Sequence, residues 1–320
     1  MTLPITVIIV SYNSAAVLPV CIEALHEHIS PAQLLVVDNV STDTSVAVAR
    51  EHGAEVIVNS VNGGFGAGCN RGARSARSDL LLFVNPDVRL TSVDGVRLRE
   101  FASRKPLGLI APRTLRAENP RDGASTLRKV TPWPCFVARE ALGPVFPRET
   151  SRGLSTSLDS PGRRSWLSGA LLLCARSEFL GLGGFDERLF LYYEDQELSR
   201  RYAEHGLPLS VTDAIAGRHV GGGSSGVKHN RRPIPRAASA ISSIELVGIM
   251  HGPHAARRAW RLYRWLHQCA AAVTWLTARG PLSTRSAQKR DELRSTQSAI
   301  VELLTASDSC YPVVKSLARG

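Results

Sequence analysis

The hydrophobic residues of the first ninety positions fall into short runs that alternate with segments of helical periodicity. Each run is continuous, which is typical of a strand buried on both faces in a parallel sheet. Strands separated by helices require right-handed crossovers, so the pattern predicts a parallel α/β sheet. The predicted strands are Ile5–Val10, Leu34–Val37, Val56–Val58 and Leu80–Val84, and the predicted helices span residues 15–28, 41–51 and 62–76.

After residue 88 the pattern becomes less regular, and from about Ala237 it is purely helical. Residues 112–164 are rich in Arg, Pro and Ser, and we expect loops and short elements there. We therefore divide the chain into an α/β domain, residues 1–236, and a helical region, residues 237–320. The elements expected beyond residue 88 are strands over 107–111 and 166–174, helices over 93–103, from Ser177 as N-cap and from Glu194 onward, and three final helices over 238–250, 255–278 and 284–305.

The apolar run Leu80–Val84 stops at Asn85-Pro86-Asp87. Proline cannot donate to a sheet ladder, so the strand ends there and Asp87 lies beyond its carboxyl end. Ligands of open α/β sheets bind at that edge, and a carboxylate there could hold a divalent metal against phosphate oxygens. A turn in which Asp87 bonds only its own backbone is an equally good interpretation of this motif alone.

The first two strands also end in polar residues, which would reach the same edge of the sheet as Asp87. This convergence favours a binding site. The glycine-rich stretch 62–72 follows the third strand and lacks the third glycine of G-x-G-x-x-G, which argues against a dinucleotide-binding fingerprint. A glycine-rich turn that lets a helix pack closely on the sheet remains the alternative for this stretch. The polar residues at the two strand ends are Ser11, Tyr12, Asn13, Asp38 and Asn39.

Two features of the second half have both a structural and a chemical interpretation. Glu194 and Asp195 occupy the first turn of a predicted helix, where acids are common because the helix dipole stabilises them. A carboxylate held ionised there would also be available as a general base. His219 precedes the glycine loop 221–226; a lone histidine is usually structural, but such loops are typical of lids that order on binding.

Eight motifs between residues 5 and 225 together resemble the inverting family 2 glycosyltransferases of GT-A fold, and most closely the bacterial rhamnosyltransferases. The resemblance implies a Rossmann-like, mostly parallel sheet flanked by helices, with a C-terminal helical appendage. The motifs are Val-Ser-Tyr-Asn (10–13), Val-Asp-Asn with Ser-Thr-Asp (37–43), Asn-Gly-Gly-Phe-Gly with Asn70 and Gly72, Asn-Pro-Asp (85–87), Trp-x-Ser-Gly-Ala (166–170), Gly-Gly-Phe-Asp-Glu (183–187), Tyr-Glu-Asp-Gln-Glu-Leu (193–198) and His-x-Gly-Gly-Gly-Ser (219–224).

The resemblance also implies roles for individual residues. Asp195 would be the catalytic base, with Glu194 as the second candidate, and Asp87 and His219 would bind Mg²⁺ or Mn²⁺. Many relatives carry Asp-x-Asp where this chain has Asn-Pro-Asp, which predicts weak metal binding until the diphosphate of the donor completes the coordination shell. Nucleotide-sugar contacts are implied for Ser11, Tyr12, Asn13, Asp38, Asn39, Asn62, Gly63, Gly64, Asn70, Asn85 and Pro86, and acceptor contacts for Trp166, Ser168 and Gly169.

The implied reaction is inverting transfer of a sugar from a nucleotide-diphosphate donor to a hydroxyl group. The resemblance suggests dTDP-rhamnose as donor and a polyprenyl-linked glycan or another cell-envelope acceptor. A soluble enzyme acting on a small natural product is the alternative, since the same catalytic residues would serve both. A non-catalytic sugar-binding relative is disfavoured because the acid pair and Asp87 are present.

A net charge of +11 and an isoelectric point near 9.8 predict an anionic partner. Nucleic acid is disfavoured, because no basic strip interleaved with aromatic residues is found and acids crowd the predicted site. The six cysteines lack metal-binding spacing, which predicts reduced thiols in a cytosolic protein. We see neither a signal peptide nor an apolar run of the roughly 20 residues that a membrane span needs. These features predict a cytoplasmic protein that is at most peripheral to the membrane.

The predicted helix 255–278 has a basic face and an apolar face. Arg257, Arg261 and Arg264 share one face, and Trp260 and Trp265 flank the boundary with an apolar face. This pattern predicts either a helix at an anionic membrane surface or one that packs on the catalytic domain. The helical region has eleven basic and five acidic residues, a difference of +6, which would favour anionic lipid. The apolar face would contain Leu262, Leu266, Val273 and Leu276.

Overall fold

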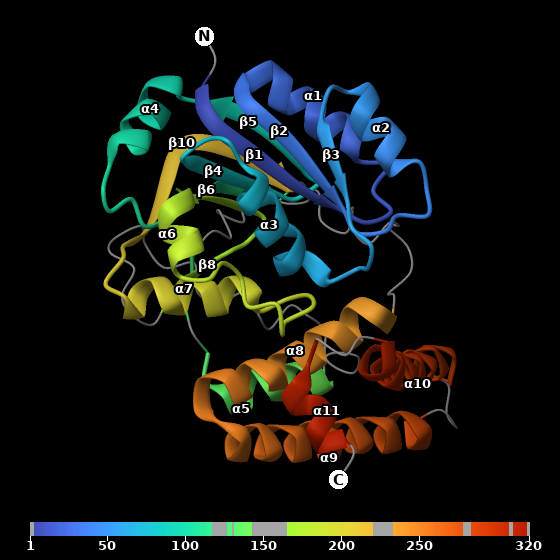
Figure 1. The fold of residues 1–320 in the computed structure, drawn as a ribbon. Coiled ribbons are helices and arrows are strands. Elements are labelled where there is room, and N and C mark those ends of the chain that lie inside the picture. Colours follow the sequence, from blue (N-terminus) through green and yellow to red (C-terminus); the bar gives the residue numbers. More distant parts are fainter. Residues whose placement is uncertain are drawn as a thin grey trace. The chain divides into compact units, whose positions relative to one another are not determined.

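The computed structural model divides into two compact units, which are described separately below (Figure 1). The first consists of Met1–Val130, Leu154–Asp186 and Glu194–His229. The second consists of Thr131–Gly153, Glu187–Tyr193 and Asn230–Gly320, so it includes two segments that precede the predicted boundary at residue 237. The structure describes residues 3–116, 127–129, 131–142, 165–219, 233–277, 283–306 and 310–318.

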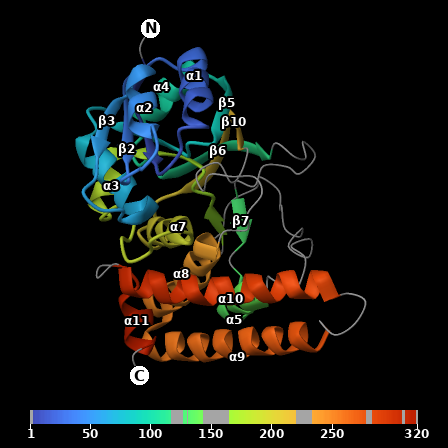
Figure 2. The same cartoon turned by 90° about the vertical axis from the view of Figure 1, so that its right-hand side faces the viewer.

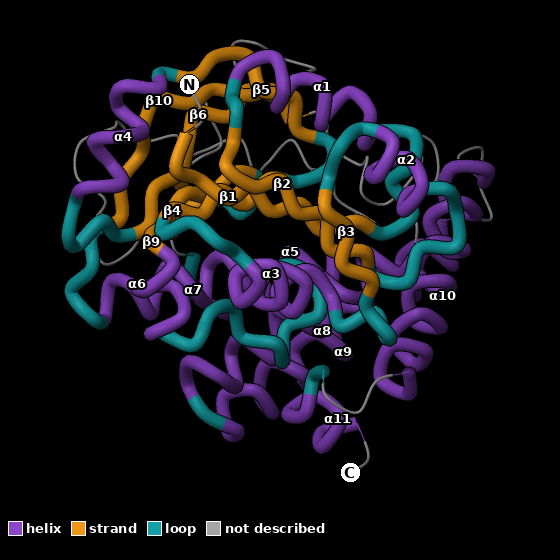
Figure 3. Tube along the Cα trace, turned by 45° about the horizontal axis from the view of Figure 1, so that its top comes forward, coloured by secondary structure: helices purple, strands orange, loops and turns teal. Residues whose placement is uncertain are grey.

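An eight-stranded mixed sheet forms the centre of the first unit (Figure 3). Its parallel part contains the four strands expected from the apolar runs, in the order β3-β2-β1-β4. The sheet continues as β9-β6-β10-β5, in which β9 is antiparallel to both β4 and β6, β10 is parallel to β6, and β5 is an antiparallel edge strand. The strands are β1 (Leu3–Ser11), β2 (Pro31–Asp38), β3 (Glu55–Val58), β4 (Leu80–Val84), β5 (Val88–Val93), β6 (Leu109–Arg116), β9 (Leu171–Ala175) and β10 (Leu209–His219).

Helices cover both faces of this sheet because its strands are apolar on both sides. Along β1, Ile5, Val7 and Ile9 join a core that includes residues of α1, α2 and α4. Ile8 and Val10 face the opposite way and join a core that includes residues of α3, α6 and α7. The first group is α1 (Leu18–His28), α2 (Ser45–Glu51) and α4 (Gly95–Ser103), and the second is α3 (Gly64–Ser75), α6 (Arg176–Gly181) and α7 (Glu194–Glu204).

Helix α3 lies close to the sheet because two of its four glycines, Gly68 and Gly72, face the sheet. A Cβ added at Gly72 would lie 2.5 Å from Ile8, and one added at Gly68 would lie 2.7 Å from Val10. A Cβ at Gly66 would lie 2.9 Å from Phe185, which belongs to a loop packed on the same helix. Glycine lowers intrinsic helix stability, so packing rather than propensity holds α3 in place.

The structure corrects several expectations about local structure. The run 166–174 is not one strand, since a turn at 168–170 separates β8 (Ser165–Leu167) from β9, and β8 pairs with β7 (Leu127–Lys129). Ser177 is not a cap, because α6 begins after Ala175 and has no side-chain cap. Strands β5 and β10 and the final helix α11 (Pro312–Ala318) were not expected.

The second unit is helical, and its core combines alanines and branched aliphatic residues with a few aromatic side chains. Helices α9 and α10 pack side by side (Figure 2). Ala256, Ala259 and Tyr263 of α9 are buried in this core, as is Leu189 from the segment Glu187–Tyr193. The helices are α5 (Trp133–Leu142), α8 (Pro233–His251), α9 (Pro253–Thr277), α10 (Ser283–Ala306) and α11.

A buried glutamate in α8 fixes the position of α11. Glu245 is fully buried, and its carboxylate accepts hydrogen bonds from the backbone N–H groups of Val313 (3.3 Å) and Val314 (3.0 Å). The segment just before α11 is bonded in turn to the segment Glu187–Tyr193, since the N–H of Tyr311 donates to the carbonyl of Arg188 at 3.0 Å. The carboxylate of Glu245 therefore stabilises the helical unit at the first turn of α11.

Replacing Glu245 with Ala should lower the free energy of unfolding by about 1–3 kcal/mol, because two buried N–H groups lose a charged acceptor. Urea unfolding of the full chain measures this loss. The control is Glu302→Ala, which removes an exposed glutamate from α10. Equal stability of the two variants would contradict the capping role of Glu245.

Candidate active site

Polar residues meet where the first two strands end, as the sequence predicts. Ser11 and Asp38 are register partners on β1 and β2. The carboxylate of Asp38 is buried and accepts a hydrogen bond from the N–H of Ser41 at 2.8 Å. The hydroxyl of Ser11 is buried and has no hydrogen-bond partner among the described residues, whereas Tyr12, the next residue, is 43% exposed. A buried hydroxyl with no partner costs free energy, so this edge of the sheet is suited to a polar ligand.

Three asparagines shape the loops around this edge. Asn13 has a left-handed backbone with φ of 50°, and its side-chain carbonyl accepts a hydrogen bond from the N–H of Thr42 at 2.8 Å. The amide of Asn39 donates to the carbonyl of Gly64 at 3.0 Å. Asn62 accepts a hydrogen bond from the N–H of Gly64 at 3.1 Å, and Gly63 is the N-cap residue of α3. These contacts hold the glycine-rich turn next to the end of β2.

Asn70 is not at the edge of the sheet with the other predicted donor contacts. It is buried in α3, and both ends of its amide bind the backbone of Phe185, with N–H···O distances of 2.9 and 2.8 Å. The neighbouring Gly184 has φ of 72°, and a Cβ there would lie 2.2 Å from the side-chain oxygen of Asn70. In the described structure Asn70 fixes the Gly184-Phe185 loop.

Asp87 and His219, the predicted metal ligands, are in contact. Nε2 of His219 lies 3.1 Å from a carboxylate oxygen of Asp87, whose side chain is only 1% exposed. The two meet because His219 ends β10 opposite Val88, the first residue of β5. Within the described ranges, no three His, Cys, Asp or Glu side chains are grouped so as to hold a metal ion. The carboxylate of Asp87 suits Mg²⁺ or Mn²⁺ as part of a shell that a substrate completes, whereas the imidazole of His219 is a poorer ligand for a hard ion such as Mg²⁺.

A turn between β8 and β9 connects the Asp87 motif to the acid pair. The N–H of Asn85 donates to the carbonyl of Ala170 at 3.0 Å. The adjacent residue, Gly169, donates its N–H to a carboxylate oxygen of Asp195 at 2.9 Å. Two backbone hydrogen bonds thus link residues that are more than a hundred positions apart in the sequence.

Asp195 is oriented by the backbone on both sides. One carboxylate oxygen accepts the Gly169 N–H, and the other accepts the N–H of Gln196 at 2.8 Å. Its side chain lies at the first turn of α7, where the helix dipole favours the ionised form. A Cβ at Gly169 would lie 3.2 Å from the Cβ of Asp195, so a glycine is needed for this close approach. Trp166 and Ser168, the other predicted acceptor contacts, are half-buried beside Gly169.

Glu194 differs from its neighbour in being buried with one carboxylate oxygen that no described residue hydrogen-bonds. Burial, followed by the charge of Asp195, raises the pKa of Glu194 to about 8. Its charge also contributes, after burial, to the raised pKa of the Cys69 thiol in α3. At neutral pH Glu194 is therefore mainly protonated, and Asp195 is the better placed of the two to act as a base.

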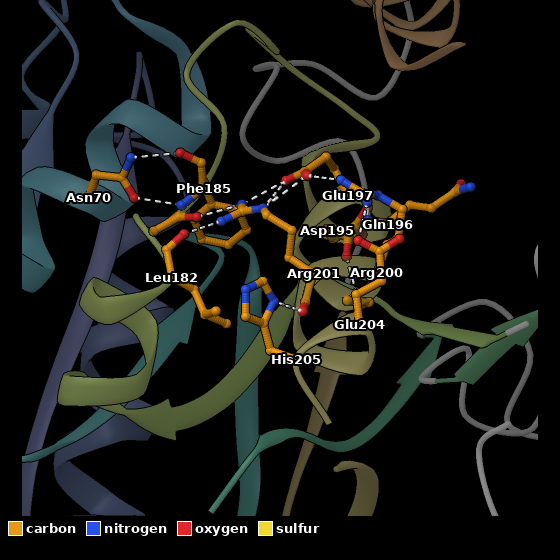
Figure 4. A network of polar contacts seen from close by, with 12 residues as sticks. Asn70, Leu182, Phe185, Asp195, Gln196, Glu197, Arg200, Arg201, Glu204 and His205 are labelled. Atoms are coloured by element: carbon orange, nitrogen blue, oxygen red, sulfur yellow. Dashed lines mark hydrogen bonds and ion pairs between the residues drawn. The ribbon is translucent and has the colours of Figure 1, made fainter. Parts of the chain in front are cut away.

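A second network holds α7 against the loop that precedes it (Figure 4). The carboxylate of Glu197 binds the guanidinium of Arg201 at 2.6 Å. Arg201 also donates to the carbonyls of Leu182 and Gly184, each at 2.6 Å. Glu197 and Arg201 were not predicted as site residues, although their i,i+4 spacing in the helix that begins at the acid pair is a recognisable signal.

The residues predicted to contact a membrane lie on α9, and most of them are exposed. Arg257, Arg261 and Arg264 are exposed, and Trp265 is 61% exposed. Trp260 is half-buried and its ring stacks on Tyr263, so it does not belong to the same surface. Val273 was expected on the apolar face but is 49% exposed. None of the helices in the described ranges is long and apolar enough to cross a membrane.

Two residues of the predicted apolar face are only half-buried, namely Leu262 and Leu266. The face of α9 that packs in the helical unit is instead formed by Ala256, Ala259, Tyr263, His267 and Ala270. The side chain of Leu276 and the glycine loop 221–226 lie outside the described residues.

Comparison with known proteins finds a family match for the part of the chain that carries the strand ends of this site and Asp87. The family model Glycosyl transferase family 2 matches residues 6–136, which include the ends of β1, β2 and β4 and the Asn85–Asp87 turn. Over residues 6–136, which are less than half of its length, the chain is therefore similar to family 2 glycosyltransferases. The resemblance inferred from the motifs is confirmed.

The curated proteins to which the chain is similar include bacterial rhamnosyltransferases. The chain is 32% identical over 196 residues to the N-acetylglucosaminyl-diphospho-decaprenol L-rhamnosyltransferase of Mycobacterium tuberculosis, an alignment that covers 55% of this chain and 62% of that protein. It is 26% identical over 149 residues to rhamnosyltransferase WbbL of Escherichia coli, covering 46% and 54%. The chain thus spans less than two thirds of the length of either protein.

Solved glycosyltransferases share the fold. A mannosyltransferase from Pyrobaculum calidifontis in complex with GDP-Man and Mn²⁺ superposes with a TM-score of 0.52 at 14% identity, covering 96% of this chain and 89% of that one. GalNAc-T7 with UDP, GalNAc and Mn²⁺ gives a TM-score of 0.58 at 14% identity, covering 98% and 58%. The predicted GT-A fold class is confirmed.

The buried Glu194 should make the stability of the protein depend on pH. The folded state holds the proton up to about pH 8, whereas an unfolded glutamate loses it near its ordinary value of 4.5. Between these values the folded state binds more protons, so the free energy of unfolding falls as pH rises.

In Glu194→Gln this fall should be smaller. Melting temperatures of both proteins from pH 5 to 8 measure the difference, with Glu204→Gln, an exposed residue of the same helix, as the control. Parallel pH profiles for wild type and Glu194→Gln would contradict the assignment.

Proposed function

We propose that the protein is an inverting glycosyltransferase that moves a sugar from a nucleotide-diphosphate donor to a hydroxyl group. The observation that carries this proposal is the pair of hydrogen bonds through the 168–170 turn, which links the Asp87 motif to Asp195. The Asp87 motif suits a divalent metal that binds a diphosphate, and Asp195 suits the deprotonation of an acceptor hydroxyl. The family 2 match over residues 6–136 supports the same reaction class.

In the proposed mechanism Asp195 removes the proton of the acceptor hydroxyl. The N–H groups of Gly169 and Gln196 each bind one of its oxygens, which fixes the carboxylate while leaving lone pairs for the proton. The acceptor oxygen then forms a bond to the anomeric carbon from the face opposite the nucleotide. The bond between that carbon and the diphosphate oxygen breaks, and the configuration inverts.

Asp87 and His219 are the residues that would hold a divalent metal, Mg²⁺ or Mn²⁺. Such an ion would neutralise negative charge on the departing diphosphate. In the described structure the two side chains bind each other, so occupancy by a metal would replace their contact with two metal–ligand bonds. The mannosyltransferase and GalNAc-T7 structures both contain Mn²⁺, which supports a metal of this class.

The donor we propose is dTDP-rhamnose, and the acceptor a polyprenyl-linked glycan or another cell-envelope glycan. The names of the mycobacterial and Escherichia coli relatives support rhamnose as the sugar, and the first supports a lipid-diphosphate acceptor. Ser11, Tyr12 and Asp38 lie together at the ends of β1 and β2 and are the proposed nucleotide contacts. We further propose that the protein works at the cytoplasmic face of the plasma membrane.

Replacing Asp195 with Asn should reduce transfer about 10²–10⁴-fold, the usual contribution of a general base, and leave donor binding nearly unchanged. The assay follows transfer from dTDP-rhamnose to a lipid-diphosphate N-acetylglucosamine by mass spectrometry, with donor binding measured by thermal shift with and without Mg²⁺ or Mn²⁺. Glu204→Gln at the exposed end of α7 is the control and should transfer normally. An Asp195→Asn variant that keeps most of its turnover would disprove the assignment of the base.

The wild-type protein should also float with anionic liposomes. Arg257, Arg261 and Arg264 are exposed on α9, and a basic residue near an anionic surface contributes about 1 kcal/mol. Changing all three to Glu should therefore abolish flotation with phosphatidylglycerol vesicles and leave transfer to a water-soluble acceptor intact. Unchanged flotation of the triple variant would exclude this face of α9 as the membrane contact.

A further inference from the structure

Two arginines lie directly opposite each other at one end of the sheet. Arg89 on the edge strand β5 is the antiparallel register partner of Arg218 on β10, and both residues are exposed. Partners in an antiparallel pair have Cβ atoms about 5 Å apart, and like charges in such a pair destabilise the sheet. An opposed pair of arginines is therefore expected only where another interaction offsets the repulsion between their charges.

A third arginine lies on the same face of the next strand. Arg113 on β6 is the register partner of Ala216, which precedes Arg218 by two residues on β10. Residues two apart on a strand share a face, so Arg113 and Arg218 project to the same side of the sheet. Arg113 is also exposed. In Figure 3 the strands β6, β10 and β5 are neighbours at one end of the sheet.

No carboxylate in the described ranges forms an ion pair with any of these three arginines. The exposed Asp213 on β10 feels the charge of Arg113, but its carboxylate forms an ion pair with Arg97 of α4. The hydrogen bond from Arg97 is the main reason that the pKa of Asp213 is lowered, and Arg113 makes only a smaller contribution. The positive charge of the three arginines is thus not neutralised by the described part of the chain.

Protection of a sheet edge does not account for the cluster. Charged side chains on an edge strand commonly prevent pairing with another chain, and this would explain Arg89 alone. Arg218 and Arg113 lie on β10 and β6, which are interior strands of the sheet. A charge on an interior strand has no edge to protect, so the cluster suits a ligand better than a structural role.

The cluster lies at the end of the sheet that carries Asp87 and His219, on the face opposite to that of Val88, whose side chain joins the core of α1 and α4. Val88, which precedes Arg89, is the register partner of His219, and Asp87 comes immediately before it. Along β6, Arg113 follows Ala111, which faces the core shared with α7. The three arginines are therefore on the face of the sheet that α7 covers, and α7 carries Asp195.

We propose that Arg89, Arg113 and Arg218 bind a phosphate or diphosphate group of the acceptor. Guanidinium groups bind phosphate oxygens through paired charged hydrogen bonds, and three of them suit a group with several negative oxygens. The proposal rests on the proposed glycosyl transfer, in which the donor diphosphate is assigned to Asp87 and His219. The arginines then select acceptors whose sugar is linked to a diphosphate over neutral glycosides.

The test compares two double variants with the same loss of charge in the full-length chain. Arg89→Gln/Arg218→Gln removes the opposed pair, and Arg50→Gln/Arg99→Gln removes two exposed arginines of α2 and α4. With a chelator present, the dissociation constant for inorganic pyrophosphate should rise about tenfold or more in the first and stay within about twofold in the second. Arg113→Gln should weaken binding in the same direction. Equal binding by both double variants would overturn the proposal.

Steady-state kinetics show whether the phosphate group that the three arginines bind belongs to the acceptor, to the donor or to a lipid headgroup. In Arg89→Gln/Arg218→Gln, KM for a lipid-diphosphate acceptor should rise about tenfold, while KM for the donor and for an alkyl glycoside of the same acceptor sugar should not change. A rise in donor KM alone would assign the cluster to the donor, and an equal loss with both acceptors would indicate a structural role. Loss of flotation with phosphatidylglycerol vesicles at unchanged KM would assign it to lipid headgroups.

Two checks separate failure of this proposal from other failures. Melting temperatures of the double variants should be no lower than that of the wild type, since removing two like charges should not destabilise the sheet. A wild-type protein that transfers no sugar from any nucleotide sugar would refute the proposed function. The pyrophosphate measurement would still decide whether the arginines form an anion site.

Discussion

The arrangement of the candidate active site depends on two backbone hydrogen bonds at the 168–170 turn. One runs from Asn85 to Ala170 and the other from Gly169 to the carboxylate of Asp195. Both use main-chain groups of the turn, so its position is fixed by backbone geometry and by the absence of a side chain at Gly169. Asp87, which contacts His219, lies two residues after Asn85. The same two hydrogen bonds therefore also constrain the position of the Asp87–His219 pair relative to Asp195. A small displacement of this turn would therefore shift both the Asp87–His219 pair and Asp195.

Several features of the site oppose stability and are held in place by their surroundings. Tyr192 and Tyr193 both have left-handed backbone conformations, with φ of 70° and 69°, directly before the acid pair. Bulky residues rarely adopt this conformation, and Glu194, which follows, is buried with an unpartnered oxygen. The contacts of Glu197 with Arg201 and of Arg201 with two loop carbonyls stabilise this region. Strain concentrated beside candidate catalytic groups is common, because position there matters more than stability.

The sequence predicted the half of the fold that follows simple periodicity. Continuous apolar runs identified β1 to β4, and the polar residues that end β1, β2 and β4 identified the edge where the site lies. Strand β10 was missed because an irregular stretch between Thr212 and Ala216 interrupts its alternation, and the turn at Ser168-Gly169-Ala170 was missed because small residues do not interrupt an apolar run. The inward contact of Asn70 with Phe185 and the alignment of Arg89 with Arg218 depend on tertiary register, which local patterns do not encode. Strand β5 could have been found, since Val88 and Leu90 alternate with Arg89 and Thr91.

The glycines of α3 have a consequence for the order in which the domain assembles. A segment with glycine at positions 64, 66, 68 and 72 has little tendency to become helical in isolation, so it cannot serve as an early nucleus. Its contacts with Ile8 and Val10 become available only once β1 is paired with its neighbours. The glycine-rich loop and the helix it opens should therefore condense late onto a sheet that has already formed, and the nucleotide end of the site would be the last part of the domain to acquire its shape.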